Sequence, residues 1–252
     1  MRLTVLGGCG AWPEPGLACS GFLIEHDGFR LVADLGYATV PRLLTRIDAS
    51  EVDAVYISHG HPDHCADLNP LLRARALGEN RPAPLPVYAP ARALDAVLAL
   101  DRPETLAGSY QVHALERGES FAIGPFRADT RLLPHWLPNF GLRLTAAGEA
   151  IVYTGDTGPS DDVVELARDA DLLIGEATHV GEVPPEARPY SCSAGIAARQ
   201  AAAAGVGRLL LTHLWPGTDH SAALAAARAE YPGALGVATA DLTIDVRKSP
   251  LP

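Results

Sequence analysis

His59-Gly60-His61-Pro62-Asp63-His64 is the stretch of sequence that decides the fold of this chain. It directly follows an apolar run, residues 54–58, which predicts a short buried strand. The first two histidines alternate along an extended backbone and can point to one side, whereas Asp63 and His64 come one turn later. The intervening glycine removes bulk, and the proline stiffens the turn. This pattern predicts two metal ions bound where a strand ends.

Two other interpretations of the histidines are an expression tag and a solvated loop. The stretch lies inside the chain, behind a strand-like run, whereas a tag would sit at a terminus. Only 9 of the 252 residues are histidine, so four ligand-type side chains at this spacing favour a metal site.

Length and composition limit the classes of protein to which this chain can belong. A chain of 252 residues with 48% hydrophobic content is large enough to bury a substantial core. We expect a single domain over residues 1–252, and no apolar run approaches the roughly 20 residues of a membrane span. Residues 1–8 resemble a strand that enters a glycine turn and lack the features of a signal peptide. The sequence therefore predicts a cytoplasmic protein with no membrane partner.

Charge and cysteine content narrow the partners. The formal net charge is −10, and the basic residues are almost all arginines dispersed along the chain. Long nucleic acids are disfavoured because proteins that bind them usually carry a basic stripe, so a small-molecule substrate is expected. The four cysteines form no C-x-x-C pair, which argues against a disulfide framework and a thiolate zinc site.

The remaining pattern alternates short apolar runs with helical segments. Strand-like runs cover residues 3–6, 22–25, 29–34, 54–58, 87–89, 126–133, 141–145, 150–154, 171–175, 209–212 and 242–246. Helical patterns cover residues 40–46, 66–77, 92–100, 161–168, 194–204 and 221–230. Near-continuous apolar strands are typical of sheets whose outer faces are covered by helices, so a layered α/β fold is predicted.

Further metal ligands are expected at the ends of other strands, since two ions need about four to five ligands each. His135, Asp156 and His213 each follow an apolar run, as the first motif does. Asp34 ends another strand and is expected to orient the motif loop. His26 and His113 lie in polar surroundings, where a surface position is expected.

The ordered set H-x-H-x-D-H, His135, Gly155-Asp156-Thr157 and Thr212-His213 resembles the metallo-β-lactamase superfamily, in its ribonuclease Z-like branch. The resemblance spans essentially the whole chain and implies a hydrolase with a four-layer αβ/βα sandwich. It implies that His59, His61 and His135 bind one ion, that Asp63, His64 and His213 bind the other, and that Asp156 bridges them. The ligand types suit zinc, with manganese and iron as alternatives. Related enzymes also suggest a homodimer.

Two departures from ribonuclease Z concern its RNA chemistry. Gly175 replaces the first His of the His-Glu-Ala-Thr element, and Tyr190-Ser191-Cys192-Ser193 stands where those enzymes carry a histidine proposed as leaving-group acid. The short spacing between His135 and Asp156 leaves no room for a long tRNA-binding arm. These features argue against tRNA 3′ processing.

Residues 59–68 are also similar to small bacterial proteins related to cyclic-nucleotide phosphodiesterases. The hypothesis is therefore hydrolysis of a small cyclic-nucleotide type of phosphodiester by a metal-bridging hydroxide, with Asp63 as catalytic base. Trp136, His179 and Trp215 are candidate substrate contacts, and Phe140 is a further candidate for base stacking. The alternatives are a lactone or thioester hydrolase, a ribonuclease Z-like RNA 3′ endonuclease, and a non-catalytic binding module, which the intact ligand set disfavours.

Overall fold

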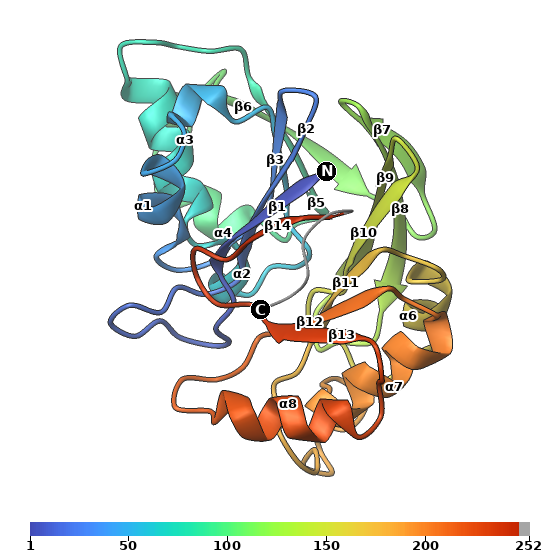
Figure 1. Cartoon of the computed structure of the whole chain (residues 1–252). Coiled ribbons are helices and arrows are strands. Elements are labelled where there is room, and N and C mark those ends of the chain that lie inside the picture. The colour runs from blue at the N-terminus through green and yellow to red at the C-terminus, as the bar shows by residue number, and fades with distance from the viewer. Residues whose placement is uncertain (247–252) are drawn as a thin grey trace.

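Two mixed β-sheets face each other in the computed structural model, which describes residues 1–246 (Figure 1). Each sheet has seven strands within these residues, in the orders β14-β1-β2-β3-β4-β5-β6 and β13-β12-β11-β10-β9-β8-β7. The strands of the first sheet are β1 Arg2–Gly7, β2 Gly21–His26, β3 Phe29–Leu35, β4 Ala54–Tyr56, β5 Leu85–Pro90, β6 Tyr110–Leu115 and β14 Thr243–Asp245. Those of the second are β7 Ser120–Ile123, β8 Phe126–Leu133, β9 Asn139–Ala146, β10 Glu149–Tyr153, β11 Leu172–Glu176, β12 Arg208–Thr212 and β13 Ala234–Val237.

Helices cover the outer face of each sheet (Figure 1). The first half of the chain supplies α1 Thr39–Leu44, the 3₁₀ turn η1 Ala49–Glu51, α2 Pro62–Cys65, α3 Leu68–Leu77, α4 Asp95–Leu98 and α5 Pro103–Leu106. The second half supplies α6 Asp161–Leu166, α7 Ala194–Ala204 and α8 His220–Arg228. The predicted four-layer sandwich is confirmed.

Alternation along the strands builds the core in three layers. On β2, Phe22 and Ile24 face the second sheet, while Leu23 between them faces the outer helices. Successive side chains of a strand point to opposite faces, so one strand contributes to two cores at once. A third apolar cluster lies between the second sheet and α6, α7 and α8. Every predicted strand is present, although several bounds shift by one or two residues.

Three strands, the short helices α2 and α5 and the turn η1 were not predicted, and one predicted helix is shorter than expected. The strands β6, β7 and β13 were missed, and His113 lies on β6 with its ring stacked 4.9 Å from that of Tyr88. His26 is also not a fully solvated residue, because it ends β2 and packs against Phe126. The helix predicted over residues 92–100 is reduced to α4, whereas α7 has the bounds that were predicted.

The loops that matter for function leave the strand ends at one edge of the sandwich. Pro62 occupies the first position of α2, with His61 as the cap, so Asp63 and His64 project from the first helical turn rather than from an irregular loop. Within residues 1–246, the helices are too short or too polar to cross a membrane.

Candidate metal centre

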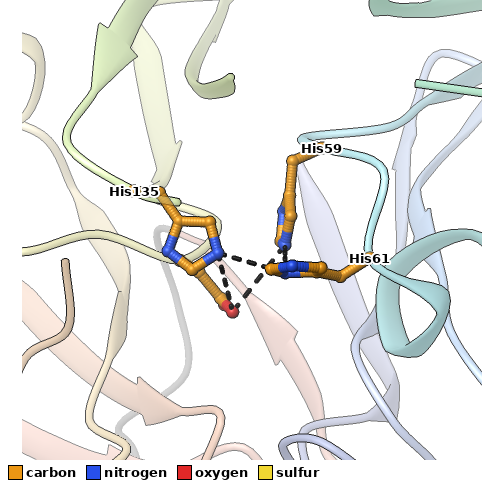
Figure 2. Close-up of side chains that lie close together, drawn as sticks. His59, His61 and His135 are labelled. Carbon is orange, nitrogen blue, oxygen red and sulfur yellow. Dashed lines mark hydrogen bonds and ion pairs between the residues drawn. The ribbon is translucent and has the colours of Figure 1, made fainter. Parts of the chain in front are cut away.

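The seven predicted ligands lie together, although they come from four separate loops. Residues 59–64 follow β4, and the other three follow β8, β10 and β12. Figure 2 shows His59 and His61 on one side and His135 reaching toward them from the opposite side. Because the two sheets face each other, their strand ends bring these side chains to one point.

The first group consists of His59, His61, His135 and Asp156. The Nδ1 atom of His61 lies 3.0 Å from Nε2 of His59 and 3.2 Å from Nε2 of His135. The Oδ2 atom of Asp156 lies 3.8 Å from Nε2 of His59 and 3.9 Å from Nε2 of His135. Three imidazole nitrogens and one carboxylate thus surround a single point.

The second group consists of Asp63, His64, His213 and again Asp156. The Nε2 atom of His213 lies 3.1 Å from Oδ2 of Asp63 and 3.2 Å from Oδ2 of Asp156. The Nε2 atom of His64 lies 3.2 Å from Oδ1 of Asp156. Asp156 therefore belongs to both groups, as a bridging ligand would.

The donor set of these groups suits two divalent ions. Among the described residues, Nε2 of His64 and Oδ1 of Asp156 are buried atoms without a hydrogen-bond partner. Such buried polar atoms are costly unless another species binds them. Imidazole nitrogens and carboxylate oxygens are the ligands that first-row divalent metals prefer. The cluster is therefore suited to a dinuclear metal site.

Hydrogen bonds behind the cluster fix which ring nitrogen faces it. Nδ1 of His64 lies 2.7 Å from Oδ2 of Asp34, and Nδ1 of His59 lies 3.1 Å from the hydroxyl of Ser58. That hydroxyl donates to Oδ2 of Asp34 over 2.8 Å. A proton held on Nδ1 leaves the lone pair of Nε2 free for an ion. Asp34 therefore hydrogen-bonds the motif loop directly, as the sequence predicted.

Burial and charge shift the pKa values in the cluster. Burial lowers the pKa of His59, His61 and His135, which favours the neutral rings that metal binding requires. Burial would also lower the pKa of His64 and His213, but the charge of Asp156 outweighs it and raises both, which favours protonated rings in the absence of ions. Burial alone would raise the pKa of Asp63, but in the metal-free protein the hydrogen bond from His213 and the charge of His64 outweigh it and lower that pKa. Asp63 is therefore a carboxylate at neutral pH.

The loop after β1 closes one side of the second group. The N–H of Ala11 donates to Oδ2 of Asp63 over 2.8 Å, and the N–H of His213 donates to the carbonyl of Gly8 over 2.8 Å. A Cβ atom at Gly10 would lie 2.8 Å from Nδ1 of His213, closer than side chains tolerate. Glycine is thus required where this loop passes the His213 ring.

A cavity of about 440 Å³ opens onto the cluster. All three predicted substrate contacts, Trp136, His179 and Trp215, line it. Phe140 does not, because it alternates into the core between the sheets, and its predicted stacking role is wrong. Sequence reasoning also missed the position of Glu176, a buried carboxylate that lines the same cavity. Burial and the nearby Asp156 raise the pKa of Glu176 to about 7.

The four cysteines lie outside both groups. All are buried, and Cys65 packs in the core behind the motif loop, as a small apolar residue does. No thiol of the described chain contributes to the two groups of candidate ligands.

Fold and site together define a metal-dependent hydrolase of the metallo-β-lactamase type. A family model described as a β-lactamase superfamily domain matches residues 19–214, and the chain belongs to that superfamily. The probable metallo-hydrolase YhfI of Bacillus subtilis is 30% identical over 223 residues, covering 85% of this chain and 87% of YhfI. The crystal structure of YhfI, a metallo-β-lactamase fold protein, matches with a TM-score of 0.88 at 27% identity, covering 97% of this chain and 99% of that one.

Two further relatives match nearly the whole chain, and one of them is named for an activity. An uncharacterised protein of Mycobacterium tuberculosis is 34% identical over 259 residues, covering 99% of this chain and 93% of that protein. Ribonuclease Z of Thermoplasma acidophilum is 28% identical over 283 residues, covering 92% of each. The predicted superfamily, ribonuclease Z-like branch and hydrolase class are confirmed. The predicted exclusion of long nucleic acids is not supported, because one of these relatives is named for its action on RNA.

Proposed function

We propose that this protein is a binuclear, zinc-dependent phosphodiesterase that acts on a small phosphodiester of the cyclic-nucleotide type. The observation that carries the proposal is the pair of ligand groups sharing Asp156 at the floor of a cavity with aromatic walls. Its candidate metal ligands are His59, His61, Asp63, His64, His135, Asp156 and His213.

Two divalent ions at this site would neutralise charge on the phosphate oxygens and lower the pKa of an attacking water. Asp63 is the group of this chain best placed to take the proton of that water. Its carboxylate lines the cavity, and its low pKa keeps it ionised at neutral pH. The hydrogen bond from Ala11 holds the carboxylate at a fixed angle. Asp63 thus combines the predicted roles of ligand and base.

Aromatic rings flank the cluster on two sides and suit a planar base. Trp136 lies 5.2 Å from the ring of Tyr190, and Trp215 lies 5.7 Å from the ring of Trp12. Both tryptophans expose about half of their surface. Exposed indole rings beside a polar cluster provide stacking surface for a nucleobase or another flat group. His179, whose ring is 6.1 Å from that of Trp215, would contact the same substrate.

The charge of the cavity favours a small substrate. Among the described residues that line it, none is lysine or arginine, while Glu176 and Glu186 are acidic. Proteins that bind long nucleic acids neutralise several phosphates with basic side chains. This cavity instead leaves charge neutralisation to the ions, which suits a single phosphodiester group.

The second candidate function is an RNA 3′ endonuclease. The ribonuclease Z of Thermoplasma acidophilum favours it, because it is 28% identical to this chain with 92% of each protein covered. The acidic cavity and the net charge of −10 stand against it.

One experiment separates these functions. Purified protein is analysed for metal content and assayed with bis(p-nitrophenyl) phosphate, cyclic AMP, a precursor tRNA and a lactone. We expect two zinc ions per chain and turnover of the first two substrates. Cleavage of the tRNA in preference to cyclic AMP would establish the RNA endonuclease instead, and lactone turnover alone would overturn both.

Asp63→Asn tests the base in the same assays. We expect kcat to fall by about 10²- to 10⁴-fold, the usual contribution of a positioned acid or base. Asp27→Asn, at an exposed carboxylate in the turn between β2 and β3, is the matched control and should retain full activity. Full activity of Asp63→Asn with both ions bound would exclude the proposed role.

A further inference from the structure

Glu176 is a buried carboxylate at the end of β11 that belongs to neither ligand group. Its Oε1 atom accepts hydrogen bonds from the hydroxyl of Thr178 over 2.7 Å, the hydroxyl of Ser191 over 2.6 Å and the N–H of Cys192 over 3.3 Å. Its Oε2 atom accepts from the N–H of Thr157. Four donors from three segments of the chain thus converge on one side chain.

The first path from Glu176 leads to His213. The hydroxyl of Thr178 donates to Glu176, so its oxygen can accept the Nδ1–H of His213, which lies 2.8 Å away. This direction of donation places the His213 proton on Nδ1. Nε2 lies within hydrogen-bond distance of Asp63, and a bound ion would replace the proton on Nε2 and take its lone pair.

The second path leads to Asp156 through its own backbone. Thr157 follows Asp156, and the bond from the Thr157 N–H to Glu176 fixes the peptide group that joins them. On the other side of Asp156, Gly155 has a φ of +59°, and a Cβ atom there would lie 2.2 Å from the side chain of Asn139. The carboxylate shared by both groups is therefore held by a tightly packed loop with Glu176 behind it.

The third path leads to His135. Ser191 and Cys192 bind Glu176 directly, which fixes the segment that also contains Tyr190. The carbonyl of Tyr190 lies 3.1 Å from Nδ1 of His135 and accepts a hydrogen bond from the Nδ1–H. As at His213, this bond leaves Nε2 of the imidazole facing the cluster.

We propose that Glu176 is a positioning residue that couples His135, Asp156 and His213 and sets their geometry for the two ions. The proposal deepens the proposed function, since it rests on these three residues being ligands. Glu176 lines the cavity, but in this role it acts through its hydrogen-bonded neighbours and not as a ligand of the ions. Residues of this kind typically change metal affinity by about 10- to 100-fold when their hydrogen bonds are lost.

Thr178→Val tests the path to His213, because valine keeps the shape of threonine but cannot hydrogen-bond. Zinc content is measured after dialysis against a series of zinc–chelator buffers. We expect one of two ions to bind about 10- to 100-fold more weakly, and Thr178→Ser to restore the affinity to within about threefold. Thr130→Val, at a buried threonine on β8 outside the cluster, is the matched control and should bind both ions normally.

Ser191→Ala provides a second, independent test on the path to His135. We expect a smaller loss of affinity, because the N–H of Cys192 still binds Glu176. Melting temperatures of the zinc-free proteins show whether each variant folds, and Ser191→Ala decides the question if Thr178→Val does not fold. Wild-type affinity for both ions in the folded variants would overturn the positioning role. Failure of the unmodified protein to bind two ions would instead overturn the ligand assignment itself.

Discussion

Two buried carboxylates stand behind the cluster, one in each sheet, and they support it in different ways. Asp34 is the penultimate residue of the first-sheet strand β3, and Glu176 is the last residue of the second-sheet strand β11. Their exposed fractions are 0% and 2%. Asp34 binds the candidate ligand His64 directly and reaches His59 through Ser58. Glu176 binds no candidate ligand directly and reaches three of them through intermediates.

The difference follows from how the ligands are spaced along the chain. The first sheet supplies its four ligands from one stretch, residues 59–64, so a single carboxylate next to that stretch can hold it. The second sheet supplies three ligands from three loops. A carboxylate that serves all three must contact their neighbours rather than the ligands. Asp34 therefore holds the first-sheet ligands through short, direct hydrogen bonds. Glu176 holds the second-sheet ligands through hydrogen bonds to several neighbouring residues.

The largest effect is expected from Asp34→Asn. The oxygen Oδ2 accepts from His64, Ser58 and the hydroxyl of Tyr153, which lies 2.6 Å away, and an amide nitrogen in its place would face donors. We expect the free energy of unfolding to fall by about 3–5 kcal/mol, as when one partner of a buried charged pair is removed. Urea denaturation measures it. Asp53→Asn, at an exposed carboxylate, is the control, and equal stability of the two variants would show that the direct support is unimportant.

A smaller, pH-dependent effect is expected from Glu176→Gln in zinc-free protein. The folded state holds the Glu176 proton up to a pKa of about 7, whereas the ordinary value is 4.5. The stability that this proton provides is therefore present below pH 4.5 and is lost as the pH rises through 7. Between these two pH values the free energy of unfolding falls by a total on the order of 3 kcal/mol.

Denaturation at pH values from 5 to 8 measures this contribution. The wild-type protein should lose stability relative to Glu176→Gln as the pH rises. Parallel curves for the two proteins would mean that Glu176 does not titrate in this range.

The smallest effect is expected from Ser58→Ala, the first-sheet counterpart of the Thr178 substitution. Alanine removes the hydroxyl between His59 and Asp34 but leaves the direct bond from His64 to Asp34. We expect zinc affinity to fall by about tenfold at the site that contains His59. Zinc titration of a Ser58→Ala, Thr178→Val double variant checks whether the two losses fall on different ions. Losses on the same ion would show that the two supports are not separate.

The sequence made the ligands predictable because their residue types and spacing are local properties. Four ligands lie in six consecutive residues, and the other three each follow an apolar run that forms a strand. Asp34 was predictable for the same reason. The zinc identity, the homodimer, the cytoplasmic location and the single domain stay predictions.

The role of Glu176 was not predictable, since its partners are 2 to 19 residues away along the chain and lie in separate loops. Half of the residues of the missed strand β6 are exposed, Val112 among them, so its short alternating sequence does not stand out as a buried apolar run. Phe140 follows His135 closely in sequence, but only the register of β9 determines that it points into the core.

The contact between Gly8 and His213 joins distant parts of the chain, and the late position of His213 sets the order in which the centre can form during synthesis. All members of the first ligand group lie within residues 59–156, so a ribosome-bound chain can assemble that group before β12 exists. The second group has to await His213, which docks on a loop made more than two hundred residues earlier. A nascent chain would therefore offer one complete ion position first and the second only when nearly all of the protein has emerged.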